Sequence, residues 1–277
     1  MKLKSTAEEK RVTRSSWFYI GAAIAAVITV LVIIGIFWTP YGPTAMDGQA
    51  KMQAPSWAHL MGTDKFGRDI FSRILKGAGT SFMVSFAVVA IGGVIGTVIG
   101  AFCGYFGGVA DAVLTRVCDT ITAFPAVLLA LVVISIVGGG TYNIILVLGI
   151  LFIPSFARIA RAEFAKARDA SYVQSARLMG AGNMRIMFRH ILPNTFSVLL
   201  PTFTIGFNNA ILSEASMSFL GIGITPPGIS LGLMLNDAQT YMGNAPWYAL
   251  SAGFTIVLII LGFSFLSEGL QQSARRS

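Results

Sequence analysis

Charged residues are scarce in this chain: Asp, Glu, Lys and Arg make up 12% of its 277 residues. A soluble domain carries about 25% charged residues, so the charged fraction of this sequence is about half that of a soluble domain. Long segments without any charge include 17–38, 77–110, 120–157, 191–213 and 238–267. Because a helix of about 20 apolar residues crosses the hydrocarbon core of a bilayer, the sequence predicts a membrane protein with several spanning helices.

Cysteine and histidine are also rare, with two of each in the chain. The two thiols, Cys103 and Cys118, are too few for a disulfide framework or a cysteine-rich metal site. His59 and His190 lie far apart in the sequence, and metal sites of this kind usually need about three or four ligands. The G-x-x-x-x-G-K-S/T motif, whose loop cradles nucleotide phosphates, does not occur in the sequence. We therefore expect no catalytic residues, no metal site, no bound cofactor and no ATPase of the chain's own.

Acidic residues are outnumbered by basic ones, which gives a net charge of +8. The basic residues flank the apolar segments and do not form one stripe, which is the pattern that sets membrane topology. This distribution argues against a nucleic-acid partner and for a lipid bilayer. Residues 1–16 are basic and precede the apolar run 17–38, which is longer than the core of a signal peptide. We expect an uncleaved first span with its basic end in the cytoplasm.

Glycines divide the apolar segments into an all-α bundle of six predicted spans. These are 17–38, 79–104, 113–137, 142–159, 194–219 and 248–268. Gly107-Gly108 and Gly138-Gly139-Gly140 separate spans, because paired glycines break a helix. With the N-terminus inside, 15 of the 20 Lys and Arg residues fall on the inner side, so the positive-inside rule places both termini in the cytoplasm. We expect neither an internal repeat nor discontinuous helices.

This interpretation divides the chain into three parts. Residues 1–16 form a cytoplasmic basic tail, 17–78 the first span and an outer segment, and 79–277 the core domain, which includes an inner loop at 158–193.

The outer segment carries turn and helix signals. Gly62-Thr63-Asp64 is typical of a turn, and 69–76 is predicted as a short interfacial helix over the mouth of the bundle, with Asp69 and Arg73 paired at i and i+4. Asp64 and Asp69 also suit a carboxylate enzyme site, but no base, metal ligand or nucleophile accompanies them.

The most informative stretch lies in the inner loop and predicts a helix–turn–helix hairpin. Ser171 and Gln174 fit a capping box at a helix start, and Gly180 fits a helix end with positive φ. Asn183 can cap a second helix that stops before Pro193. The predicted apolar stripes are Tyr172, Ala176 and Met179 in the first helix and Met184, Phe188 and Ile191 in the second.

The hairpin is basic, which leaves two interpretations open. It carries Arg177, Arg185 and Arg189 and no acidic residue, so it suits an amphipathic element that rests on anionic lipid. It equally suits a knob that docks a cytoplasmic partner. The small residues that favour close approach, and so the knob, are Ser175, Ala176, Gly180, Ala181 and Gly182.

Charged residues inside the predicted spans are functional candidates by default, because burying them is costly. Glu214 is the clearest, either as a carboxylate facing polar neighbours or a partner subunit, or as a substrate-binding group. The polar neighbours expected for it are Asn208, Asn209 and Ser213. Arg116 and Asp119 are expected to pair with each other or with lipid headgroups.

The hairpin resembles a known family motif. Gln174-Ser175-Ala176, then Gly180, His190 and Leu192-Pro193, resembles the EAA loop of ABC importer permeases, with Gln174 and Ser175 replacing Glu and Ala and His190 in the Ile slot.

Other segments resemble the C-type permease of the dipeptide/oligopeptide/nickel group, from about His59 to Gln271. They are His59–Asp64, Gly67-Arg68-Asp69, Ser72-Arg73, Gly104–Gly108 with Asp111, Arg161–Glu163, Tyr172-Val173, Arg189–Asn194 and Ser218–Gly223 with Pro226-Pro227. The chain departs from the group at Leu231, where Trp is usual, and at Ser267–Gln271.

The resemblance implies a fold and a function. It implies six transmembrane helices, a cytoplasmic EAA-type coupling hairpin, a homologous second permease subunit, two cytoplasmic ABC ATPases that use ATP and Mg, and an extracytoplasmic substrate-binding protein. The expected location is the bacterial or archaeal cytoplasmic (inner) membrane, and the expected cargo is short peptides, with nickel or a metal chelate as the alternative. An ATP-independent channel or carrier and an integral membrane enzyme are the rival classes.

The resemblance also assigns residues. The expected ATPase-coupling residues are Tyr172, Gln174, Ser175, Ala176, Gly180, Ala181, Arg185, His190 and Pro193. Asn208 and Glu214 are candidates for the pathway or the intersubunit contact, and Asp64, Arg68 and Asp69 for the outer segment.

Overall fold

The computed structural model describes the backbone of residues 2–274 and the side chains of residues 19–271. All named elements in this part are helical. Five helices are long and apolar enough to cross a membrane, or up to six if a bent pair counts as one span. The predicted all-α polytopic fold is confirmed. The side chains of the basic residues 1–16 lie outside the described residues, and the backbone from Lys2 is continuous with the first span.

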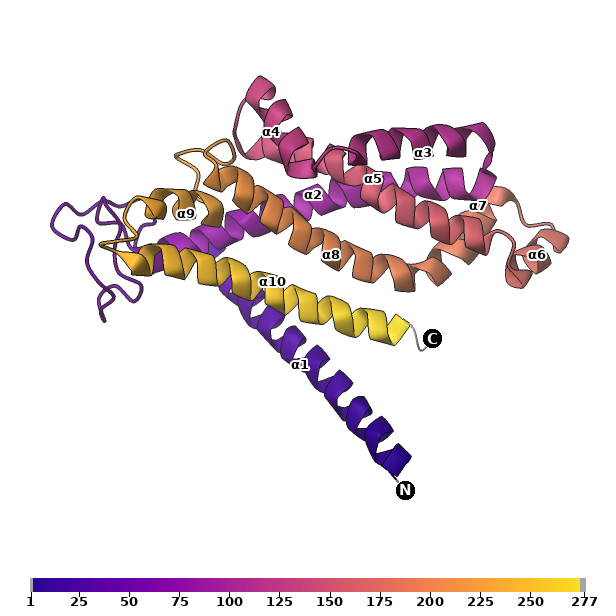
Figure 1. Cartoon of the computed structure of the whole chain (residues 1–277), viewed down its shortest axis with the longest axis horizontal. Coiled ribbons are helices and arrows are strands. Elements are labelled where there is room, and N and C mark those ends of the chain that lie inside the picture. The colour runs from indigo at the N-terminus through magenta and orange to yellow at the C-terminus, as the bar shows by residue number, and fades with distance from the viewer. Residues whose placement is uncertain (1, 275–277) are drawn as a thin grey trace.

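Most of the long helices run roughly along the longest dimension of the molecule, whereas the first helix diverges from the others (Figure 1). In chain order, the helical elements are α1 (Lys2–Phe37), α2 (Ile70–Phe106), α3 (Gly108–Thr122), α4 (Ala126–Val137), α5 (Thr141–Ala167), α6 (Ser171–Leu178), α7 (Asn183–Arg185), the π-helical turn η1 (Ile186–Ile191), α8 (Leu192–Phe219), α9 (Leu231–Gln239) and α10 (Pro246–Ala274).

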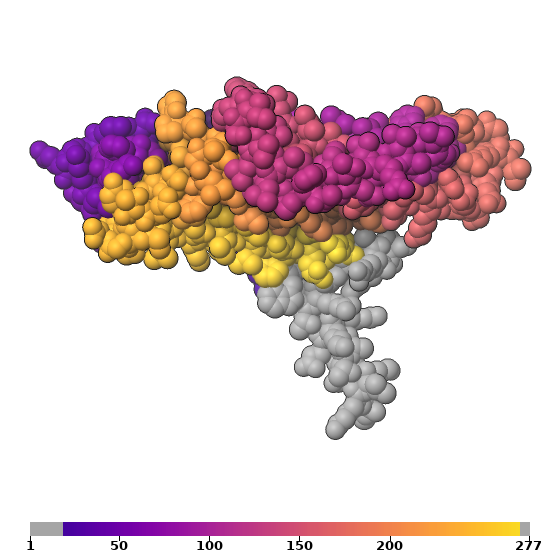
Figure 2. Space-filling view, turned by 45° about the horizontal axis from the view of Figure 1, so that its top comes forward, coloured from indigo at the N-terminus to yellow at the C-terminus, as the bar shows by residue number. Residues whose placement is uncertain are grey.

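The bundle has two distinct ends. Segment 38–69 and α9 lie at one end, which we call the loop end, and α6 and α7 lie at the opposite end, the hairpin end (Figures 1 and 2). The first turns of α1 and the last turns of α10 both point toward the hairpin end (Figure 1).

The third predicted span, 113–137, is broken. Helices α3 and α4 meet at an angle of 83°, and Pro125 is the N-cap residue of α4. Proline lacks an N–H and disfavours the helical conformation in the residue before it, so the helix cannot continue through this point. The expectation of a straight span and of no discontinuous helix was wrong here.

The predicted short helix at 69–76 is the beginning of α2. Asp69 caps this helix by accepting a hydrogen bond from the N–H of Ser72 at 2.7 Å. The charged side chains of residues 69–76 suggested a helix separate from the span. In the structure, however, Arg73 is buried in the first turns of α2 and pairs with Asp64. The helix therefore runs on into the span without a break, and the prediction of an independent interfacial helix was wrong.

A column of glycines brings α2 directly against α5. Gly92, Gly96, Gly100 and Gly104 recur at every fourth residue, and a Cβ at Gly100 or Gly104 would collide with the carbonyl oxygen of Ala157 or Arg161. Small residues at this spacing let membrane helices approach closely. The spacing is visible in the sequence, but its partner helix is not.

Pro193 does not end the hairpin. It lies in the first turn of α8, where a missing N–H leaves no hydrogen bond unmade. Helix α7, the turn η1 and α8 therefore form one apolar unit from Asn183 to Phe219. The prediction that the second hairpin helix stops before Pro193 was wrong. Helix α9, whose N-cap Ser230 accepts from the N–H of Leu233 at 3.2 Å, was not predicted.

Candidate functional site

The hairpin turns at Gly180, which adopts φ +81°. Its N–H donates to the carbonyl oxygen of Arg177, and that of Ala181 to the carbonyl oxygen of Ala176. The positive φ predicted for Gly180 is confirmed. The predicted capping box is wrong, because the N-cap residue of α6 is Ala170 and the Gln174 side chain donates instead to the carbonyl oxygen of Asp169 at 3.1 Å.

A small hydrophobic cluster holds the hairpin against the bundle. Val173 and Ala176 are 0% and 2% exposed and pack with side chains of α2, α5 and the turn η1. The cluster consists of Ala101, Tyr105, Phe164, Val173, Ala176, Ile186, Met187 and Ile191. The predicted stripes are therefore confirmed at Ala176 and Ile191, which are buried in the cluster, and wrong at the other positions. In the first stripe Val173 takes the place of Tyr172, and Met179 is 80% exposed.

Tyr105, in the last turn of α2, connects both arms of the hairpin to the bundle. Its hydroxyl group donates to Asn183 Oδ1 at 3.0 Å and accepts from Arg177 Nη2 at 3.2 Å. The Arg177 guanidinium carbon also lies 5.5 Å from the centroid of the tyrosine ring. Sequence reasoning gave Tyr105 no role, although it belongs to the Gly104–Gly108 motif.

The tip of the hairpin is apolar and exposed. Leu178 is 90% and Met179 is 80% exposed, and Met184 and Phe188 are about half exposed. Helix α6 projects beyond the ends of its neighbours in Figure 1. The tip thus presents Leu178 and Met179 as large, mostly exposed hydrophobic side chains, whereas Phe188 also contacts the ring of Phe102, with 6.4 Å between the centroids. The exposed side chains of Arg185 and Arg189 border the tip.

The nine predicted hairpin residues fall into two groups. Ala176 is buried, and Ala181 and His190 are half-buried, so these three help to seat the hairpin. The remaining six are exposed: Tyr172, Gln174, Ser175, Gly180, Arg185 and Pro193.

Two ion pairs connect α3 to α5 near the hairpin end. Arg161 forms a bidentate pair with Asp111, in which Nη2 lies 2.7 Å from Oδ2. Asp119 pairs with Arg158 at 3.2 Å, and not with Arg116 as predicted. Both partners of the second pair are more than half exposed, so it contributes little stability.

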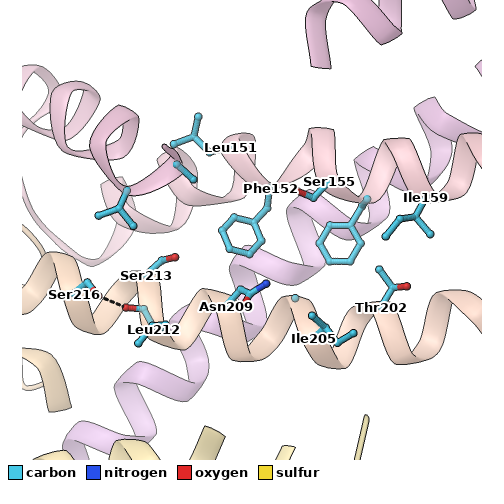
Figure 3. Close-up of a pocket in the computed structure, with 14 residues that line it drawn as sticks. Leu151, Phe152, Ser155, Ile159, Thr202, Ile205, Asn209, Leu212, Ser213 and Ser216 are labelled. Carbon is cyan, nitrogen blue, oxygen red and sulfur yellow. Dashed lines mark hydrogen bonds between the residues drawn. The ribbon is translucent and has the colours of Figure 1, made fainter. Parts of the chain in front are cut away.

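A groove opens between α5 and α8 in the middle of the bundle, beside the start of α4. Its volume is about 460 Å³, which lies within the size range of ligand pockets. Its polar side chains are Ser155, Thr202, Asn209, Ser213 and Ser216. Its apolar wall includes Phe152 and Phe156, and no side chain that lines it is charged. Figure 3 shows the α5 and α8 side chains facing one another across this space.

Asn208 and Asn209 point in different directions. Asn208 donates to Ser264 Oγ on α10 at 2.9 Å, whereas Asn209 lines the groove (Figure 3). Successive residues on a helix point about 100° apart, so only one of the two can face α5. The sequence singled out Asn208, but the groove residue is Asn209.

Glu214 lies outside the groove and is 0% exposed. Its Oε1 accepts a hydrogen bond from the Ser218 hydroxyl at 2.7 Å, and Ser81 and Ser230 lie near the same carboxyl group. These serines, and not the expected Asn208, Asn209 and Ser213, are its polar neighbours.

The three predicted outer residues lie close together at the loop end. Asp64 is fully buried and accepts from Arg68 Nε at 2.6 Å, while Arg73 Nε lies 3.6 Å from the same carboxylate. Asp69 contacts His59 Nδ1 at 2.9 Å, so the predicted Asp69–Arg73 side-chain pair was wrong. The residues form a structural network.

No group of three or more His, Cys, Asp or Glu side chains is placed to hold a metal ion within the described residues.

Comparisons with known proteins agree with this architecture. Residues 96–276 match the family model described as "Binding-protein-dependent transport system inner membrane component". The glutathione transport system permease protein GsiD of Pectobacterium atrosepticum is 40% identical over 257 residues, which cover 91% of this chain and 85% of that relative. The dipeptide transport system permease protein DppC of Haemophilus influenzae is 35% identical over 271 residues, covering 93% of this chain and 92% of the relative.

A solved structure shares the fold. The MetNI methionine ABC transporter contains a chain that superposes with a TM-score of 0.61 at 19% sequence identity. The match covers 73% of this chain and 95% of that chain.

Proposed function

Because this chain belongs to the family of binding-protein-dependent transport system inner membrane components, we propose that it carries short peptides through a pathway it shares with a second, homologous permease subunit. The chain is a multi-pass permease subunit of an ABC importer, and it has no ATPase of its own. The rival classes of ATP-independent channel and membrane enzyme are set aside by this membership.

The observation that carries the coupling role is the exposed apolar tip of the hairpin. Leu178 and Met179 present large hydrophobic side chains to the surroundings, and unpartnered apolar surface of this kind marks an interaction site. We assign this tip to one of two cytoplasmic ATPases, which bind ATP and Mg. This chain then needs no cofactor, and the hairpin end lies in the cytoplasm with both termini.

The second observation is that the groove between α5 and α8, whose lining combines polar and apolar side chains, is not enclosed by this chain alone. A pathway with polar walls in a membrane must be covered on its open side, and a homologous permease subunit would supply that cover. An extracytoplasmic binding protein would deliver the cargo at the loop end. The chain would then span the cytoplasmic (inner) membrane of a bacterium or archaeon, with both termini in the cytoplasm.

The proposed cargo is a short peptide, and two features support it over nickel or a metal chelate. Relatives of high similarity are named for dipeptide and glutathione transport. The groove offers hydroxyl and carboxamide groups, whereas nickel prefers imidazole or other strong donor ligands.

Reconstitution tests the proposal. The chain is assembled in proteoliposomes with its sister permease, two ATPases and binding protein, and uptake of labelled di- and tripeptides is measured with ATP trapped on the side of the ATPases. We expect ATP-dependent accumulation by the full complex and none by this chain alone. Leu178→Asp should abolish both ATPase co-purification and uptake while the chain still inserts. Peptide uptake without nucleotide, or ATPase recruitment unaffected by Leu178→Asp, would contradict the proposal.

A further inference from the structure

We infer that the groove between α5 and α8 recognises the peptide groups of its cargo through neutral hydrogen bonds from Asn209, Ser213 and Ser155, and that it does not distinguish cargo by charge. This inference rests on the proposed function, because it takes the groove as half of a peptide pathway. Beyond the proposed function, it names the side chains that contact the cargo and states that the charge of the cargo is not recognised.

The three side chains lie in one patch. Asn209 and Ser213 are four residues apart on α8 and therefore share a face, and Ser155 comes from α5 on the opposite wall. Figure 3 shows all three beside the space between the two helices. Their neighbours in the wall are aromatic and aliphatic side chains such as Phe152 and Leu212.

These three side chains differ from the other polar groups of the groove. The hydroxyl groups of Thr202 and Ser216 donate to carbonyl oxygens of their own helix, at 2.9 and 2.7 Å. Within the described chain, the side chains of Asn209, Ser213 and Ser155 have no hydrogen-bond partner. Their donors and acceptors remain available to a ligand.

The chemistry of the patch matches a peptide group. A carboxamide carries two N–H donors and one carbonyl acceptor, so Asn209 can pair with both the C=O and the N–H of a peptide unit. The serine hydroxyls donate and accept in the same way. Such contacts are common to all peptides, while the apolar wall accommodates varied side chains without specific polar partners.

Charge is absent from the lining. A fixed charge in a poorly solvated groove attracts or repels a charged ligand strongly, and such repulsion is a common source of discrimination. Without it, acidic, neutral and basic peptides should pass this half of the pathway at similar rates. A charge introduced at Asn209 should create discrimination where none existed.

The experiment uses the full reconstituted complex and three tripeptides, Ala-Ala-Ala, Ala-Glu-Ala and Ala-Lys-Ala, each at saturating concentration so that capture by the binding protein does not limit uptake. We expect the wild-type maximal rates to agree within about threefold. In Asn209→Asp, the rate for the acidic peptide relative to the basic one should fall by about fivefold or more. Asn209→Leu should slow all three peptides by a similar factor, about three- to tenfold.

Asn208→Asp is the matched control, because it places the same charge one residue away, facing α10. It should leave the acidic-to-basic ratio unchanged at equal amounts of assembled complex. An unchanged ratio in Asn209→Asp, or an equal shift in both variants, overturns the inference while the peptide-import function stands. A wild-type complex that carries none of the three peptides refutes the proposed function itself.

Discussion

The Tyr105 hydroxyl group lies 3.0 Å from Asn183 Oδ1, which ties the end of α2 to the second arm of the hairpin. The same hydroxyl accepts a hydrogen bond from Arg177 on the first arm. Because α2 packs against α5 along its glycine column, a continuous series of packed helices connects the hairpin with the groove. Tyr105 is therefore placed to carry motion from the hairpin into the spans.

Removal of this hydroxyl should uncouple transport from ATP hydrolysis. Tyr105→Phe keeps the ring in its hydrophobic cluster but loses both hydrogen bonds, each worth about 0.5–1.5 kcal/mol. We expect peptide uptake to fall several-fold while ATPase co-purification and the ATPase rate change little. Tyr142→Phe is the control, since Tyr142 is 83% exposed. Equal losses of uptake and ATPase activity in Tyr105→Phe would contradict a coupling role.

The turn of the hairpin gives a second prediction, which distinguishes the effect of backbone conformation from the effect of side-chain size. A Cβ at either Gly180 or Gly182 meets no atom within 4 Å, so neither position is crowded. Gly180 has φ +81°, which a β-branched residue resists, whereas Gly182 has φ −70° and extended backbone. Gly180→Val should abolish uptake and weaken ATPase recruitment, and Gly182→Val should be far milder, with insertion intact in both.

The same assay distinguishes docking from lipid binding. If the hairpin rested on anionic lipid, its arginines would dominate, and the triple change of Arg177, Arg185 and Arg189 to Gln would be the more damaging. We expect this triple variant to be milder than Gly180→Val or Ala176→Asp. The reverse order, measured by co-purification and uptake at matched expression, would assign the hairpin to the membrane surface.

Because α2 and α5 approach closely, we expect alanine substitutions at two helical glycines to change the stability of the protein differently. Gly100→Ala forces a Cβ into the Ala157 carbonyl, and overpacking of this kind costs about 1–3 kcal/mol. Gly253→Ala, where the nearest atom is 4.0 Å away, should be neutral or slightly stabilising, because alanine favours helix over glycine by about 1 kcal/mol. Thermal unfolding of the purified complex measures both, and equal midpoints would disprove the helix contact.

Topology gives the last prediction. In a background without Cys103 and Cys118, which are both buried, cysteines are placed at Leu178 and at Trp57, which are 90% and 96% exposed. An impermeant thiol reagent added outside intact cells should label position 57 and spare position 178 until the membrane is opened. Labelling of position 178 from outside would reverse the proposed orientation.

The sequence by itself determined the class of protein, the position of most of the apolar helices and the position of the hairpin turn. These features depend only on local sequence. The length of an apolar run is set against the thickness of the bilayer, and the turn at Gly180 depends on the backbone sterics of a single residue. The family likewise follows from short motifs in order.

Only the tertiary structure decided where side chains point and what they pair with. Whether Asn208 or Asn209 faces the groove depends on the rotation of α8 against α5 and α10, a shift of about 100° that periodicity in an almost uniformly apolar helix does not fix. Asp119 meets Arg158 from another helix, 39 residues away, instead of its neighbour Arg116. Such contacts arise when helices pack, because the partner is chosen by proximity in space and not by spacing along the chain.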